Sequence, residues 1–232
     1  HKLNLPKNFK LVITGGGRVG KGALEVIEKT NIKKVSPEDF LSKDFNFPVY
    51  THLSVKDYVS RNDKKNFDKS VFFDNPAGHS STFMDYAQVA DLYVACHYWD
   101  NRSPFIFTRK DMENPNWKIS VVADVSCDID GPVACTIRPS TITNPFYGYD
   151  PKTQKEVDFL NKKSVGVMAV DNLPCELPKD ASLEFGKMFI DHVLEPITGN
   201  DPEKIIYRAS ETINGKLTPH FEYLQDYLEG KD

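Results

Sequence analysis

The sequence predicts an α/β protein with a Rossmann-type doubly wound parallel sheet and C-terminal helices. One observation is local: an apolar run, Leu11–Thr14, leads directly into the Gly-x-Gly-x-x-Gly pattern of residues 15–20, and a helical segment follows it. The other is distributed along the chain. Short β-branched runs, of the kind buried on both faces in parallel sheets, alternate with helical segments.

The individual elements follow from periodicity and from turn residues. Residues 38–70 are mixed and charged, and we expect irregular connections there, with a short strand at 48–50. Expected strands are 9–14, 32–35, 92–97, 119–125 and 164–170. Expected helices are 20–29, a segment capped by Ser80 or Ser81 and running to Ala90, 108–113, 181–194 and 219–228.

Composition excludes several partner classes. The 232 residues carry 29 basic and 33 acidic side chains, a formal net charge of −4, which favours neither nucleic acid nor an anionic membrane as partner. No apolar run approaches the roughly 18–20 residues that span a bilayer. The four cysteines lack Cys-x-x-Cys spacing and the histidines lack His-x-x-x-His spacing, so we expect no metal site, and reduced thiols in a cytoplasmic protein.

The glycine pattern predicts a dinucleotide site because each glycine has a physical role. Gly15 permits the tight turn, Gly17 lets the backbone approach a pyrophosphate, and Gly20 lets the helix pack closely on the strand. The N-terminus of the helix then offers free N–H groups to the phosphates. The alternative interpretation of such a pattern is an ordinary glycine-rich loop.

Polar residues at strand ends are the next candidates, since ligands of open parallel sheets lie beyond the carboxyl ends of the strands. Ser36 stands after the second expected strand, where NAD-binding proteins usually have an acidic residue. This slightly favours NADP over NAD, although Ser36 also fits a surface turn. His97 and Tyr98 end another strand, and either flank a ring of the cofactor or pack at the rim.

Carboxylates follow the last two expected strands. Asp124 and Asp128 could orient a ribose or stabilise a developing iminium cation, and a turn cap is the alternative for both. Asp171 and Asn172 would face the same crevice.

Four motifs together resemble the nucleotide-binding region of the lysine–ketoglutarate reductase and saccharopine dehydrogenase family, which groups with alanine dehydrogenase and pyridine nucleotide transhydrogenase. They are Gly-Arg-Val-Gly-Lys-Gly-Ala (17–23), Tyr98-Trp99, Ala-Asp-Val-Ser-Cys-Asp (123–128) and Val-Asp-Asn-Leu-Pro (170–174). Residues 144–150 and 217–223 also resemble the reductase branch, so the similarity spans nearly the whole chain.

The resemblance implies hydride transfer between a nicotinamide cofactor, NAD or NADP, and an amino acid or 2-oxo acid, through an imine. It makes Asp128 and Asp171 the catalytic candidates. It assigns cofactor binding to Gly15, Gly17, Arg18, Val19, Gly20, Ser36, His97, Tyr98, Val170, Asp171, Asn172 and Leu173.

The chain departs from the family pattern in what precedes the glycine motif. Family members have a separate N-terminal domain that supplies a Lys and His acid–base pair. We therefore expect residues 1–177 to form an NAD(P)-binding domain and residues 178–232 a helical segment that packs on that missing domain, or else drives homo-oligomerisation. Alone, the chain would bind cofactor with little turnover, because acid–base catalysis contributes roughly 10²–10⁴-fold. Alternatives are a non-catalytic NAD(P)-binding regulatory module, an alanine dehydrogenase-like enzyme, or a methyltransferase.

Overall fold

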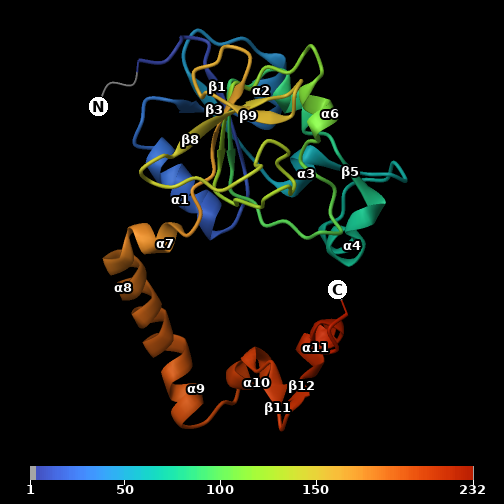
Figure 1. Ribbon diagram of the computed structural model, residues 1–232, viewed down its shortest axis with the longest axis vertical. Coiled ribbons are helices and arrows are strands. Elements are labelled where there is room, and N and C mark those ends of the chain that lie inside the picture. Colours follow the sequence, from blue (N-terminus) through green and yellow to red (C-terminus); the bar gives the residue numbers. More distant parts are fainter. Residues whose placement is uncertain (1–3, 232) are drawn as a thin grey trace. The chain divides into compact units, whose positions relative to one another are not determined.

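The computed structural model describes residues 4–231 and divides the chain into two compact units (Figure 1). The first unit ends at Asp171 and the second begins at Asn172. The main sheet of the first unit comprises β1 (Lys10–Thr14), β2 (Lys33–Lys34), β3 (Val49–Leu53), β6 (Leu92–Ala95), β7 (Val121–Asp124), β8 (Phe146–Asp150), β9 (Lys155–Val157) and β10 (Val165–Met168).

The strand order of this sheet is β2-β3-β1-β6-β7-β10-β8-β9. Strands β2 to β10 in that order run parallel, while β8 pairs antiparallel with β10, and β9 antiparallel with β8. After β1 the chain forms β2 and β3 on one side of β1, and it then crosses to β6 on the other side. The adjacent strands β1 and β6 therefore mark the topological switch point. The predicted Rossmann-type fold is thereby confirmed.

Helices, a 3₁₀ turn and a separate hairpin connect the strands. They are α1 (Arg18–Ile27), α2 (Pro37–Ser42), α3 (Val55–Tyr58), α4 (Lys69–Asp74), a 3₁₀ turn (Pro76–Gly78), α5 (Met84–Ala87) and α6 (Arg109–Met112), with a separate antiparallel hairpin formed by β4 (Val59–Arg61) and β5 (His79–Ser81).

The core lies on both faces of the sheet because successive side chains of a strand point to opposite sides. Leu11 and Ile13 of β1 pack in one cluster with Ile27 of α1. Val12, between them, packs in the larger cluster on the other face. Phe83 is a fully buried ring of that larger cluster, and its centroid lies 4.6 Å from that of Tyr93. Strand β1 is thus buried on both faces, as its apolar sequence predicts, whereas both residues of the edge strand β2 are exposed.

Two expectations from the sequence were wrong, and one element was missed. Residues 38–70 contain α2, α3 and β4 in addition to β3, which corresponds to the strand expected at 48–50. The segment after the 3₁₀ turn begins with strand β5, not with a helix capped by Ser80 or Ser81, and only α5 is helical. The β8–β9 hairpin was not expected at all. These elements are three to six residues long, too short for the period of a helix or of a strand to emerge from the sequence.

The second unit is helical with one small hairpin. Its elements are α7 (Leu173–Glu176), α8 (Pro178–Phe189), a π-helical turn (Ile190–Leu194), α9 (Glu195–Thr198), α10 (Ile205–Ala209), β11 (Thr212–Ile213), β12 (Lys216–Leu217), a 3₁₀ turn (Pro219–Leu224) and α11 (Gln225–Leu228). Within the described part of the chain, α8 has no buried residue, and Leu183, Phe185 and Met188 are exposed.

Candidate functional site

The turn between β1 and α1 shows a separate reason for each of its glycines. Gly15 has a φ of +104°, and a Cβ built there would lie 2.1 Å from the Cys96 carbonyl oxygen. A Cβ on Gly20 would lie 1.8 Å from the Gly15 carbonyl oxygen. Gly17, the N-cap of α1, would meet nothing within 4 Å. Two glycines are therefore required by the fold, and the third leaves open space at the helix N-terminus.

Open space and free N–H groups at the start of a ten-residue helix fit a phosphate group. Arg18 and Val19 follow Gly17 in the first turn of α1 and are exposed, and no acidic side chain lies in that turn. His52 of β3 supports the turn from the side, with its Nε2 2.8 Å from the Gly15 carbonyl oxygen. The turn thus has the shape and the charge that a pyrophosphate needs.

The carboxyl end of β6 lies against this turn, because the backbone nitrogen of His97 is 2.7 Å from a Cβ built on Gly15. The His97 side chain is 7% exposed, and burial lowers its pKa to about 4. Its Nδ1 is 3.1 Å from Thr14 Oγ1, which in turn is 2.8 Å from Tyr93 Oη. Tyr98, the next residue, is 91% exposed. Of these two adjacent candidates, His97 is therefore buried and Tyr98 is exposed.

A small solvent-open cavity of about 80 Å³ is lined in part by His97. Its walls come from the segment after β3, from α4 and from the loop that follows β6. Aromatic rings dominate these walls, and they belong to Tyr58, Phe72, Phe73, Tyr98, Trp99 and Phe105.

Asp124 at the end of β7 organises a turn. Its fully buried carboxylate accepts hydrogen bonds from Ser126 Oγ at 2.5 Å and Thr136 Oγ1 at 2.6 Å, and from the N–H groups of Ser126 and Cys127, both at 3.1 Å. Of the two sequence interpretations, the turn is the one these contacts support. Cys127 adopts a left-handed φ of 52°, and its thiol donates to the Ala169 carbonyl at 3.2 Å. The loop after β7 is thereby tied to the end of β10.

Asp128 follows in the same loop and is half-buried. Burial, and secondarily the charge of Asp124, raises the pKa of its carboxyl. Val170 is buried and forms an isolated β-bridge with Ser140, whereas Asp171 is exposed. Asp128 and Val170 thus stand on loops at the carboxyl ends of adjacent strands, β7 and β10.

Asn172 and Leu173 belong to the second compact unit. Asn172 has a left-handed φ of 49° and immediately precedes α7.

Ser36 lies elsewhere than the sequence spacing suggests. It caps α2, where its Oγ accepts from the Asp39 N–H at 3.1 Å. It follows β2, and β2 is separated from β1 by β3. The strand that pairs with β1 on this side is β3, and its last residue, Leu53, lies opposite Thr14. The residue that follows this strand is Ser54. The missing acidic residue at Ser36 therefore carries no information about the choice of cofactor.

Sequence reasoning overlooked Ser54 and Asp57 at this strand end. The Ser54 N–H and Oγ both donate to Asp57 Oδ2, each at 2.7 Å. It also overlooked the buried Thr14 and Tyr93 behind His97. The expected short strand at 48–50 was the available signal for Ser54, but its partner strand can be identified only from the pairing.

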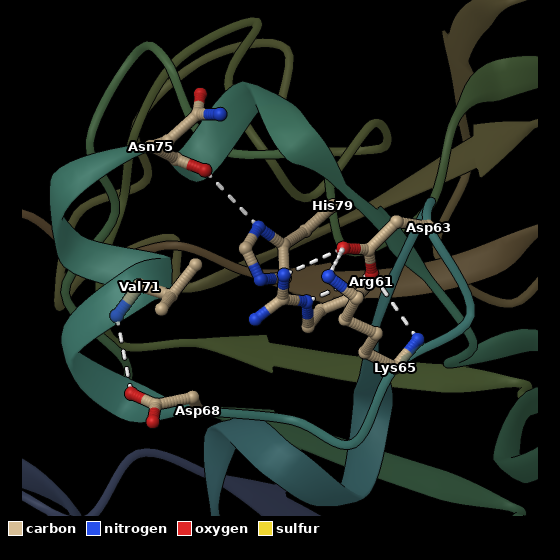
Figure 2. A network of polar contacts seen from close by, with 7 residues as sticks. All are labelled: Arg61, Asp63, Lys65, Asp68, Val71, Asn75 and His79. Carbon is tan, nitrogen blue, oxygen red and sulfur yellow. Dashed lines mark hydrogen bonds and ion pairs between the residues drawn. The ribbon is translucent and has the colours of Figure 1, made fainter.

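A second polar cluster lies on the β4–β5 hairpin (Figure 2). The guanidinium of Arg61 donates two hydrogen bonds, of 2.9 and 2.6 Å, to the carboxylate of Asp63. His79 Nδ1 donates to the Asn75 carbonyl at 3.1 Å, and its ring meets the edge of Phe72 at a centroid distance of 5.1 Å. Because Phe72 also lines the cavity beside His97, the cluster supports one of the cavity walls.

Metal-binding groups and membrane-spanning helices were also sought in residues 4–231. These residues contain no group of three or more His, Cys, Asp or Glu placed to hold a metal ion, and no helix long and apolar enough to cross a membrane. The four cysteines are all free thiols.

Comparison with known proteins shows what the chain is similar to. No protein-family model matches the chain. It is 27% identical over 236 residues to alpha-aminoadipic semialdehyde synthase of Arabidopsis thaliana, covering 92% of this chain and 22% of that protein. It is 27% identical over 262 residues to the mitochondrial alpha-aminoadipic semialdehyde synthase of Mus musculus, covering 98% and 28%. The cytoplasmic location inferred from the cysteines stays a prediction.

Shorter matches extend the comparison. Saccharopine dehydrogenase [NAD(+), L-lysine-forming] of Schizosaccharomyces pombe is 30% identical over 105 residues, covering 45% of this chain and 27% of that protein. The chain also superimposes on an L-alanine dehydrogenase structure with a TM-score of 0.47 and 16% identity, over 95% of this chain and 53% of that one. The chain spans about a quarter of the length of the semialdehyde synthases that it matches. The chain is thus similar to alpha-aminoadipic semialdehyde synthases and saccharopine dehydrogenases, as its motifs predicted.

Proposed function

We propose that this chain is the nicotinamide-dinucleotide-binding portion of an oxidoreductase that acts on the CH–NH group of an amino acid. The observation that carries the proposal is the glycine turn, in which Gly15 and Gly20 are sterically required while Gly17 leaves open space at the N-terminus of α1. The names of the relatives support the amino-acid chemistry, and one of them specifies NAD(+).

The site divides along the edge of the sheet. The turn at Gly17 and the exposed Arg18 would hold the pyrophosphate. The loops after β7 and β10 would border the nicotinamide, with Asp128, Val170 and Asp171 as the residues concerned, and Asn172 and Leu173 following them. When bound, the dinucleotide supplies hydride exchange with the substrate. Asp128, a half-buried carboxyl with a raised pKa, would orient the polar group of substrate or ribose that lies nearest to it.

The substrate class is an amino acid paired with a 2-oxo acid, and the resemblance points to lysine with 2-oxoglutarate. The acid–base groups for this chemistry would come from the remainder of a longer enzyme, because the chain spans only about a quarter of its semialdehyde synthase relatives. The second unit would pack against that remainder through the exposed apolar side chains of α8.

Binding of the dinucleotide is tested by fluorescence titration, because Trp99 lines the cavity beside the glycine turn. We expect NADH or NADPH to quench tryptophan fluorescence saturably, and S-adenosylmethionine to leave it unchanged. Gly17→Val should abolish saturable quenching by filling the phosphate space without disturbing the fold, and Gly22→Ala, also with nothing within 4 Å, is the matched control. Quenching by neither dinucleotide would refute the proposal, and quenching by S-adenosylmethionine would favour a methyltransferase.

The choice between NAD and NADP would be made at the end of β3. A carboxylate there repels a 2′-phosphate, and Asp57 is the carboxylate that Ser54 holds in place. Asp57→Asn should therefore raise the affinity for NADPH relative to NADH by a few-fold. Glu38→Gln, on the helix that Ser36 caps, should leave the ratio unchanged. If Glu38→Gln changed the ratio of NADPH to NADH affinity and Asp57→Asn did not, the selecting position would lie near Ser36 instead.

A further inference from the structure

The peptide group that joins Gly15 to Gly16 is the part of the glycine turn whose direction its own residues leave open. Both residues lack a side chain, and glycine adopts backbone angles that other residues avoid. Gly16 is exposed, and a Cβ built on it would meet nothing within 4 Å. No side chain of these two residues therefore opposes a rotation that exchanges the directions of the C=O and N–H groups of this peptide.

The direction of this peptide is fixed by a side chain of the neighbouring strand. His52 of β3 is half-buried, and its Nε2 lies 2.8 Å from the Gly15 carbonyl oxygen. Because a carbonyl oxygen can only accept, Nε2 carries the hydrogen and donates it. His52 stands opposite Ile13 in the pairing of β3 with β1. The contact thus joins the end of β3 to the first peptide of the turn that follows β1.

The hydrogen bond from His52 also determines where the Gly16 N–H points. In a trans peptide the C=O and N–H groups point in opposite directions, so a carbonyl held toward His52 turns the Gly16 N–H away from it. Within residues 4–231 this N–H makes no hydrogen bond to another backbone group. The reversed peptide would present a carbonyl oxygen, the negative end of its dipole, where the N–H now stands. The observed direction attracts an anion, and the reversed one repels it.

We propose that His52 is a positioning residue that holds the Gly15 carbonyl toward β3 and so presents the Gly16 N–H to the pyrophosphate of the dinucleotide. This inference rests on the proposed function and deepens it. The Gly16 N–H then acts together with the free N–H groups at the N-terminus of α1, which begins at Arg18. Because His52 sets the direction before the ligand arrives, binding does not have to select it from two orientations.

The binding test compares ADP, which carries a pyrophosphate, with adenosine, which carries none, each displacing NADH from the full chain. We expect His52→Leu to bind ADP about five- to tenfold more weakly than wild type, the effect of one lost hydrogen bond, and adenosine equally well. His52→Gln, whose amide can donate from a similar position, should restore ADP binding to within about twofold. His220→Leu, the same change at an exposed histidine of the second unit, is the matched control and should bind both ligands as wild type does.

The other outcomes each contradict a defined step. Equal ADP affinity in wild type and His52→Leu would overturn the inference while leaving dinucleotide binding intact. Equal weakening of ADP and adenosine would mean that His52 only stabilises its surroundings, and ADP binding by His52→Gln as weak as by His52→Leu would remove the N–H from the explanation. Either result overturns the inference. If neither NADH nor ADP binds wild type, the proposed function itself fails.

A measurement on wild type tests the same geometry if His52→Leu does not fold. In a nitrogen-15 NMR spectrum of the full chain, the His52 ring should show a protonated Nε2. Saturation with ADP should shift the amide signal of Gly16, and it should shift that of Gly22, inside α1, much less. A bare Nε2 on His52, or a Gly16 amide that does not respond while ADP is bound, would contradict the inference.

Discussion

The glycines in the turn after β1 have different roles, although the sequence motif does not distinguish them. Gly15 and Gly20 are excluded from bearing a side chain by backbone atoms of the turn itself and of the neighbouring strand end. Gly17 and Gly22 meet nothing within 4 Å. The requirement at Gly17 would come from a ligand rather than from the fold, whereas Gly22 is an exposed helical position with neither constraint.

We predict opposite effects of alanine at two of these positions. Gly20→Ala places a Cβ 1.8 Å from the Gly15 carbonyl oxygen, so backbone must move, and the free energy of unfolding should fall by about 3 kcal/mol or more. Gly22→Ala should raise it by about 0.5–1 kcal/mol, because alanine is the better helix former. Urea denaturation of both variants measures this, and equal stabilities would disprove the steric account.

His97 predicts how stability depends on pH. Its pKa is lowered from 6.5 to about 4 by burial, so between these values the unfolded chain binds a proton that the folded chain does not. The contribution of His97 is therefore fully present above pH 6.5 and is lost as pH falls toward 4, at up to about 1.4 kcal/mol per pH unit. Denaturation of wild type and His97→Gln across this range should show a shallower slope for the variant. Parallel slopes would contradict the prediction.

At the scale of elements, the loop after β7 depends on one buried carboxylate. Asp124 accepts from Thr136 and from the start of its own turn, and Cys127 then reaches the end of β10. The strand ends that would border the nicotinamide are thus positioned by an internal network, and Asp128 is carried by that network without being part of it.

Removing the Thr136 hydroxyl tests this arrangement. Thr136→Val keeps the shape of a fully buried side chain but leaves one oxygen of Asp124 unpaired, so the free energy of unfolding should fall by about 1.5–3 kcal/mol. Thr141→Val, at an exposed threonine, is the control and should change it by less than about 0.5 kcal/mol. Similar values for the two variants would mean that the Asp124 network contributes little.

At the scale of the whole molecule, the two compact units differ in how they bury apolar surface. Both core clusters consist of residues of the first unit. In the second unit, apolar side chains of α8 such as Phe185, at 74% exposure, remain accessible. The first unit therefore contains its own core, whereas residues 172–231 contain no buried apolar side chain.

Truncation after Asp171 should consequently leave a folded protein. We expect residues 1–171 to unfold cooperatively near the midpoint of the full chain, as measured by circular dichroism. The full chain should bind the dye ANS, which reports exposed apolar surface, and the truncated chain should bind much less. A truncated chain without a cooperative transition would show that the first unit needs residues 172–232.

Much of the first unit could be read from the amino-acid sequence because the relevant signals are local. The glycine spacing after β1 and the apolar runs of β6, β7 and β10 each depend on neighbouring residues. They predicted the fold class, the dinucleotide hypothesis and the family resemblance. Asp128 and His97 were found in the same way, as polar residues that end buried runs.

Other features depended on which distant segments meet. Pairing placed β3, not β2, beside β1, and for this reason we propose the end of β3, rather than Ser36, as the cofactor-selecting position. Burial brought Thr14, Tyr93 and His97 into one buried hydrogen-bonded group. Strand pairing and burial arise from contacts between residues far apart in the chain, and no local pattern encodes them. Local chemistry thus predicted the kind of site, and tertiary packing decided which of the candidate residues lie near one another.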